Sequence, residues 1–134
     1  MPDSPRSSAD IVRDLYKAFA AKDIETIRSI FDPDIEWIQL PGFPGGHHRG
    51  ADAVLANAFT RLRTEWTDWR AVVHEWIDAG SSVVAIGVYT ATNNATGKPM
   101  EAAFAHVYDL KDGRIIRMRQ YTDTLMVERA ARPG

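Results

Sequence analysis

Apolar residues recur at helical spacing along the first half of the chain and leave polar residues on the opposite side. A first helix is expected to begin near Ala9, capped by Ser7 or Ser8, with an apolar side made of Ile11, Val12, Leu15, Tyr16 and Phe19. A second helix follows Asp23 and stops before Pro33, because proline disfavours helical geometry at the residue before it. A third runs from about Asp52 to Arg63. The pattern therefore predicts three amphipathic helices.

The spacing changes to alternation from Trp69 onward, which is typical of strands with one buried face. Asp112-Gly113 is a strong hairpin signal, because glycine adopts positive φ without cost. Consecutive strands joined by short turns predict an antiparallel sheet. A short strand is expected at Ile35–Leu40, before an irregular loop at Pro41–Gly50. The four long strands are expected at about Trp69–Asp78, Ser82–Thr92, Met100–Leu110 and Arg114–Thr124.

Helices followed by antiparallel strands indicate an α+β fold with the helices on one side of the sheet. Gly87 allows the long strands to bend, so the sheet should curl into a cone with an open mouth. Such a concave site is typical of small-molecule binding. We expect one domain over residues 1–134, with flexible tails at residues 1–7 and 128–134.

Composition narrows the functional classes. A net charge of −2 without a basic block argues against nucleic acid or an anionic membrane as a partner. No apolar run approaches the length of a membrane span, and the N-terminus has no secretory h-region, so a cytoplasmic protein is expected. The chain has no cysteine, which excludes disulfides and thiolate metal sites. The adjacent His47 and His48 lack a third ligand at suitable spacing, so we expect no metal.

Three segments resemble the SnoaL-like branch of the nuclear transport factor 2 (NTF2) / ketosteroid isomerase superfamily. They are AAKDIETIRSIFDPDIEW, GGHHRG and HVYDLKDGRIIRMRQYTD, and the resemblance covers about residues 10–127. It implies an NTF2-like cone, with three N-terminal helices packed on a strongly curved antiparallel sheet. It also implies an apolar or cyclic small-molecule ligand and no cofactor. A homodimer is expected because the outer face of the curved sheet carries Val, Ile and Phe residues, and such a face usually needs cover. The superfamily includes isomerases, polyketide cyclases, epoxide hydrolases and proteins without chemistry, so the fold does not assign a reaction.

The resemblance supports some candidate catalytic residues better than others. The aspartate base of the steroid isomerases matches Gln39, which cannot take a proton. Asp123 matches an aspartate of the limonene epoxide hydrolases, but the strand Val83–Thr92 lacks their other aspartate and their arginine. The aspartate and histidine of the polyketide cyclases match Asp123 and His106. These two residues are the predicted catalytic pair, with Asp123 as acid/base in an apolar pocket that raises its pKa.

Strand register leaves the position of His106 open. A regular ladder from the Asp112-Gly113 turn pairs His106 with Arg119 and puts His106 and Asp123 on one face. The resemblance instead puts the alternate residues, Ala105, Val107, Met118 and Gln120, in the cavity. A β-bulge between Met118 and Asp123 would turn Asp123 inward and leave His106 outside. We favour the second arrangement, with His106 structural and near a dimer surface.

The remaining site residues are predicted to position a ligand. Tyr16 and Trp37 share faces with inward residues and are the expected pocket walls. The complete predicted substrate-binding set is Tyr16, Trp37, Gln39, His47, Phe59, Met118, Gln120 and Tyr121. Three interpretations remain open: cofactor-free cyclisation or isomerisation, ligand binding without chemistry, and water addition to an epoxide.

Overall fold

The computed structural model describes residues 7–43 and 46–134. The first helix, α1 (Ser8–Ala21), is capped by the Ser7 side chain, which accepts a hydrogen bond from the backbone N–H of Asp10. Asp23 caps α2 (Ile24–Ile30) in the same way through Thr26. Both caps confirm the positions predicted from sequence. Most of the expected N-terminal tail, and part of the loop at Pro41–Gly50, lies outside the described residues.

The third helical region is continuous and has three parts, α3 (Ala51–Ala53), η1 (Val54–Phe59) and α4 (Thr60–Glu65). The middle part, η1, is a π-helix, which accommodates one more residue than a regular helix. The hydroxyl of Thr60 donates to the carbonyl of Leu55, five residues earlier, at 3.1 Å. The apolar side of η1 packs into the main core with residues of α1 and β1. None of the helices in the described part of the chain is long and apolar enough to cross a bilayer.

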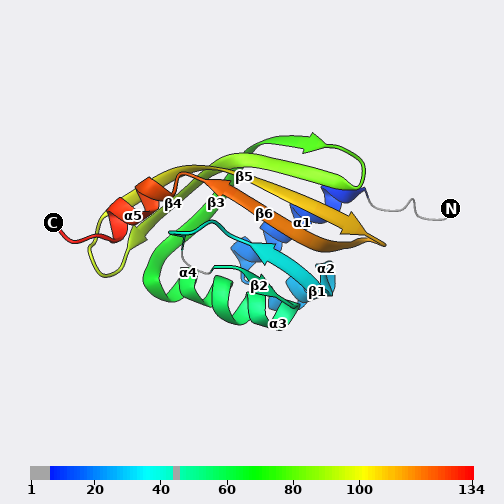
Figure 1. Ribbon diagram of the computed structural model, residues 1–134, viewed down its shortest axis with the longest axis horizontal. Coiled ribbons are helices and arrows are strands. Elements are labelled where there is room, and N and C mark those ends of the chain that lie inside the picture. Colours follow the sequence, from blue (N-terminus) through cyan, green and yellow to red (C-terminus); the bar gives the residue numbers. More distant parts are fainter. Residues whose placement is uncertain (1–6, 44–45) are drawn as a thin grey trace.

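Six strands form one curved sheet in the order β2-β1-β6-β5-β4-β3 (Figure 1). Their bounds are β1 Phe31–Ile38, β2 His48–Arg49, β3 Trp66–Asp78, β4 Ser82–Asn93, β5 Pro99–Lys111 and β6 Arg114–Thr122. The four long strands are antiparallel, as predicted, but β1 runs parallel to β6. The first strand, β1, lies beside the last strand, β6, but no hairpin joins the two. The direction of β1 could therefore not be predicted from the turns. The α+β cone is confirmed, with a mixed sheet.

The helices cover one face of this sheet and bury a shared core. Val12 and Leu15 of α1 pack with Tyr108 of β5 and Met118 of β6 in one apolar cluster. Successive residues of β5 alternate between this cluster and the opposite face, as the pleat requires. The inward residues of the sheet therefore form the floor of the space beneath the helices.

Gly87 of β4 lies close against the backbone of β3. A Cβ atom at this position would lie 1.9 Å from the carbonyl oxygen of Val72. Beside it, the register of the two strands shifts between Val73 and Glu75, where His74 is the extra residue. The glycine and the bulge together allow the sharp bend that was expected from the sequence.

The end of the chain differs from the expectation of a long final strand and a frayed tail. The last strand ends at Thr122, and Thr124–Ala131 form α5, which lies against β5 and β4 of the sheet (Figure 1). Val127 and Ala130 are buried in a second apolar cluster with Phe43 and Phe104. The helix starts because the Asp123 side chain accepts a hydrogen bond from the Met126 backbone N–H at 3.3 Å. The predicted flexible segment 128–134 is thus helical through residue 131.

Two other boundaries were predicted less well. β1 begins at Phe31, four residues earlier than expected, and β3 begins at Trp66 rather than Trp69. The expected loop contains the two-residue strand β2, which pairs with β1 at Glu36 and Trp37. Each difference extends the sheet, because tertiary pairing overrides a weak local signal.

Candidate ligand-binding site

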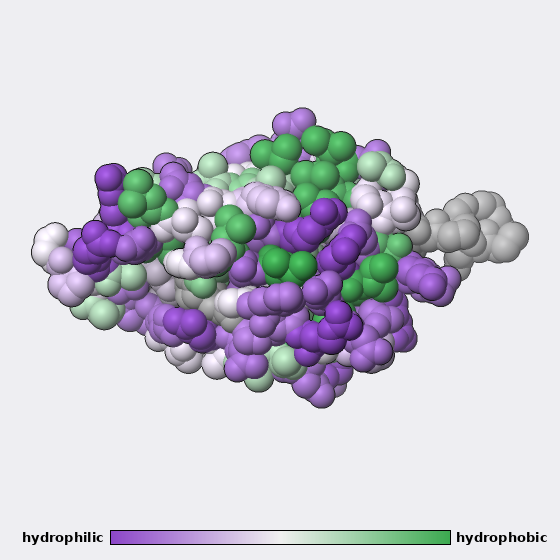
Figure 2. All heavy atoms as spheres, viewed as in Figure 1, coloured by the Kyte–Doolittle hydropathy of each residue, from purple (hydrophilic) through white to green (hydrophobic). Residues whose placement is uncertain are grey.

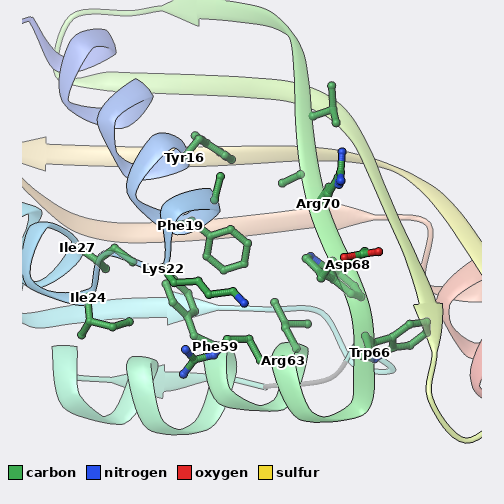
Figure 3. Close-up of a pocket in the computed structure, with 15 residues that line it drawn as sticks. Tyr16, Phe19, Lys22, Ile24, Ile27, Phe59, Arg63, Trp66, Asp68 and Arg70 are labelled. Carbon is green, nitrogen blue, oxygen red and sulfur yellow. The ribbon is translucent and has the colours of Figure 1, made fainter.

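An open pocket of about 480 Å³ lies between the end of α1, the helices α2 and α4, and the first half of β3 (Figure 3). Its wall is largely apolar, with Phe19, Phe59 and Trp69 among the lining residues. Charged side chains lie among the lining residues as well, namely Lys22, Arg63, Asp68 and Arg70. Pockets of this size bind small organic molecules.

A second, much smaller hollow of about 40 Å³ continues the pocket toward the sheet. The two hollows share six lining residues: Tyr16, Phe19, Phe59, Leu62, Trp69 and Ala71. The inner one also reaches Trp37, Gln39 and four residues of the long strands. Its volume is close to that of one water molecule, roughly 30 Å³. A ligand would therefore keep its body in the outer pocket and insert one substituent into the inner cavity.

An unexpected register between β5 and β6 brings polar side chains to this inner cavity. Arg114 pairs with Lys111 at the hairpin as expected, but a bulge at Ile116 then shifts the ladder by one residue. His106 consequently lies opposite Gln120, and Tyr108 lies opposite Met118. All four side chains are buried on the helix-covered face. The bulge therefore puts His106 on the same face as Met118 and Gln120, so its favoured outward position is wrong. Ala105 and Val107, which the resemblance places in the cavity, lie on the opposite face of the sheet.

A chain of hydrogen bonds runs through these buried groups. The Leu40 backbone N–H donates to Gln120 Oε1 at 3.3 Å, and Gln120 Nε2 donates to the Tyr89 hydroxyl at 2.9 Å. The Tyr89 hydroxyl in turn contacts His106 Nε2. On the other side of the imidazole, His106 Nδ1 lies 2.5 Å from the Tyr16 hydroxyl, which is 2.9 Å from the hydroxyl of Tyr108.

The Leu40 contact fixes the direction of this chain. An amide nitrogen can only donate, so Tyr89 accepts from Gln120 and must place its own hydrogen elsewhere. His106 Nε2 is the acceptor within reach among the described residues, so Tyr89 donates to it. The neutral imidazole then carries its proton on Nδ1 and donates to Tyr16. One hydroxyl hydrogen of the Tyr16–Tyr108 pair is left without an acceptor in the described part of the chain.

Burial keeps every member of the chain neutral. Loss of hydration lowers the pKa of His106 to about 3. The same loss raises the pKa of Tyr16, with a further contribution from Tyr108, and it also raises the pKa values of Tyr89 and Tyr108 above that of a free phenol. At neutral pH these groups therefore act as hydrogen-bond donors and acceptors and carry no charge.

Two further polar atoms, which belong to residues that line the inner cavity, are buried without a partner among the described residues. They are the indole Nε1 of Trp37, which is a donor, and Oε1 of Gln39, which is an acceptor. A buried polar atom without a partner costs about 1–3 kcal/mol. A ligand oxygen that accepted from Trp37 and from the Tyr16–Tyr108 pair would remove this cost, and a ligand hydroxyl could donate to Gln39.

The structure brings together most, but not all, of the residues predicted for the site. Those at the inner cavity are Tyr16, Trp37, Gln39, Phe59, His106 and Met118, while Gln120 lies behind them in the hydrogen-bonded chain. His47 instead pairs with Glu36 at 3.1 Å, and the Tyr121 side chain is exposed on the sheet. Asp123 is exposed at the start of α5 and lines neither hollow, so its expected position in an apolar pocket is wrong.

Sequence analysis missed Tyr89 and Tyr108 as site residues. The signal was present in β5, where Phe104, His106 and Tyr108 alternate and so share a face. Polar aromatic residues on a buried face require hydrogen-bond partners, which is a reason to place them together. The basic residues that line the outer pocket, Lys22, Arg63 and Arg70, could not be predicted as a group, because they belong to three separate parts of the chain.

Comparisons with known proteins agree with this fold. The profile of the SnoaL-like domain matches residues 12–118. An NTF2-like protein from Burkholderia thailandensis is 37% identical, with a TM-score of 0.91, over 96% of this chain and 99% of that one. An NTF2-like protein of unknown function from Burkholderia pseudomallei is 28% identical, with a TM-score of 0.82, over 91% and 95% of the two chains. No functionally curated protein matches the sequence.

A third similar structure contains a named compound. It is TerC co-crystallized with polyporic acid, which is 26% identical to this chain, with a TM-score of 0.81, over 91% of this chain and 95% of that one.

Proposed function

The chain belongs to the SnoaL-like domain family, and on that premise we propose that it binds a small cyclic compound through a carbonyl or enol oxygen. One observation carries this proposal: among the residues that line the inner cavity, the Trp37 indole and the Tyr16–Tyr108 pair hold donors that lack an acceptor in the described part of the chain. The apolar walls of the outer pocket suit the ring system. The co-crystal of TerC with polyporic acid supports a small organic ligand for this fold.

Neutral donors at one oxygen also suggest a reaction. If the ligand loses a proton next to its carbonyl, the resulting enolate oxygen is stabilised by the same hydrogen bonds, as in an oxyanion hole. Cofactor-free isomerisation or aldol cyclisation passes through such an enolate. This catalytic role is the second candidate function, favoured by the ordered chain from Gln120 to Tyr16 that holds the donors in place.

The geometry assigns no acid/base role to Asp123, which lies outside both hollows. Among the described residues that line the inner cavity there is no carboxylate, and His106 is held neutral. Epoxide opening needs a carboxylate that activates water, so the site favours carbonyl binding over water addition. A proton acceptor for turnover would have to come from Asp68 of the outer pocket, from the ligand or from water.

The test uses two matched probes, 1-tetralone and tetralin, which differ in one carbonyl oxygen. We expect the protein to bind tetralone about five-fold more tightly, measured through tryptophan fluorescence, because a hydrogen bond to an unpaired buried donor is worth about 1 kcal/mol. Trp37→Phe and Tyr108→Phe should reduce this preference. Tyr121→Phe, an exposed control, should keep it. Equal affinity for the two probes in the wild-type protein would reject carbonyl recognition.

The same proposal includes a homodimer formed through the face of the sheet opposite the helices. This face carries apolar side chains that are only half-buried, among them Val84, Ile86, Val88 and Val107. A contiguous apolar sheet face is typical of a surface that a partner covers. We expect sedimentation at micromolar concentration to show a dimer that Val107→Glu dissociates. A monomeric wild-type protein would contradict the dimer and leave the binding proposal intact.

A further inference from the structure

The outer pocket has an unbalanced charge. Three basic side chains, Lys22, Arg63 and Arg70, and one acidic side chain, Asp68, line it, which leaves a local charge of +2. The whole chain, by contrast, has a net charge of −2. The pocket therefore concentrates positive charge where a ligand enters.

These three cations make no ion pair with any residue that the structure describes. Some other arginines in the chain are paired: Arg61 contacts Glu65 at 2.7 Å, and Arg117 contacts Asp109 at 2.7 Å. The contrast is sharpest on α4, where Arg61 is neutralised and Arg63, two residues later, lines the pocket. Unpaired cations beside an apolar pocket are available to a ligand.

The charged residues come from three parts of the chain that surround one pocket. Lys22 follows α1, Arg63 lies on α4, and Asp68 and Arg70 lie at the start of β3 (Figure 3). Lys22 and Asp68 both have positive φ, 57° and 54°, which is unfavourable for residues with a side chain. At Lys22, the left-handed residue that ends a helix, glycine would be the more stable choice. The chain therefore keeps a cation at the opening at a cost in stability.

We propose that the ligand is an organic anion, with a ring system in the outer pocket and a carboxylate among Lys22, Arg63 and Arg70. This inference rests on the proposed carbonyl binding and extends it to the opposite end of the molecule. Opposite ends of the ligand then meet different chemistry: neutral donors beside the inner cavity and full charges around the outer pocket. The carboxylate stays partly hydrated at the opening, while the carbonyl oxygen exchanges water for Trp37 and the Tyr16–Tyr108 pair.

The experiment compares a 1-tetralone that carries a carboxylate on its aromatic ring with the methyl ester of the same compound. The wild-type protein should bind the carboxylate at least five-fold more tightly at low salt, and the preference should shrink as salt rises, because exposed charges are screened. Arg63→Ala, Arg70→Ala and Lys22→Gly should each reduce carboxylate affinity about two- to five-fold. Ester affinity should stay unchanged. Lys111→Ala, in the distant hairpin, is the matched control.

The outcomes separate the two proposals. Tight binding of the ester and of unsubstituted tetralone, with no advantage for the carboxylate, would overturn the anion proposal and leave carbonyl binding intact. Failure of every tetralone to bind would overturn both. An equal loss of carboxylate affinity in Lys111→Ala would show a general charge effect and would also overturn the inference. Lys22→Gly adds a second measurement, since it should raise thermal stability while it weakens carboxylate binding.

Discussion

Gln120 Nε2 lies 2.9 Å from the hydroxyl oxygen of Tyr89 and can only donate to it. Because the backbone N–H of Leu40 holds the other end of the same amide, the side chain cannot turn around without losing a bond. The direction of this contact sets the tautomer of His106 two links away. A residue that touches no ligand thereby controls which donors the inner cavity offers.

The tautomer can be measured directly. We expect long-range proton–nitrogen NMR spectra at pH 7 to show that His106 is protonated on Nδ1 and unprotonated on Nε2. In Gln120→Glu a carboxylate replaces the donating amide and accepts the hydrogen of Tyr89, so His106 should become protonated on Nε2. A wild-type imidazole with its proton on Nε2 would contradict the deduced chain.

The buried imidazole should also make stability depend on pH. Burial lowers the pKa of His106 from 6.5 to about 3, so the unfolded state binds a proton that the folded state refuses. Its contribution is complete above pH 6.5 and is lost as the pH falls from 6.5 toward 3. Between pH 7 and pH 5 the free energy of unfolding should fall by about 2 kcal/mol from this residue.

Urea denaturation of matched variants isolates that contribution. His106→Phe keeps an aromatic ring but cannot be protonated, so its stability should change less with pH over this interval. His74→Gln removes an exposed histidine and should retain the wild-type slope. Identical slopes in the wild-type and His106→Phe proteins would mean that the histidine is not held neutral by burial.

Asp123 should matter for the last helix and not for the ligand. Asparagine caps helices as well as aspartate does, so Asp123→Asn should leave stability and tetralone affinity unchanged. Asp123→Ala removes the cap and should cost about 1 kcal/mol of stability, again with unchanged affinity. Loss of tetralone binding in Asp123→Asn would show that this carboxylate contributes to the ligand site.

Gly87 should be the least replaceable glycine of the sheet. A methyl group there would meet the Val72 carbonyl at 1.9 Å, so Gly87→Ala should lower the free energy of unfolding by about 3 kcal/mol. Gly80 has open space around it and only a positive φ of 79°, so Gly80→Ala should cost about 1 kcal/mol. Chemical denaturation of both variants tests the comparison, and equal losses would contradict it.

Local patterns were sufficient for most of the fold and insufficient for the site. The caps at Ser7 and Asp23, and the turn at Asp112-Gly113, depend on neighbouring residues and were predictable. The bulge at Ile116 depends on how β5 and β6 fit the core, and the alternation of apolar residues does not predict its position. One extra residue there decides which side of the sheet each later side chain faces.

Asp123 shows why the chemistry was placed wrongly. The same carboxylate that could serve as an acid/base also accepts a backbone N–H at a helix start, and the short sequence after it gave only a weak helical signal. Tyr89 and His106 lie seventeen residues apart on adjacent strands, so their contact follows from pairing and not from proximity in the chain. Sites assembled from separate elements in this way need the register before they can be recognised.

The π-helical segment Val54–Phe59 decides how this part of the ligand site responds to a change in chain length. A π-helical turn holds more residues than an α-helical turn, in which each residue advances about 100° around the axis. Deleting the exposed Asn57 would therefore restore regular geometry and leave Phe59 and Leu62, which line both hollows, near their present directions. Deleting a second residue would rotate these side chains by about 100° and redraw the passage between the two compartments, giving homologous proteins a way to change guests while every polar group on the strands stays the same.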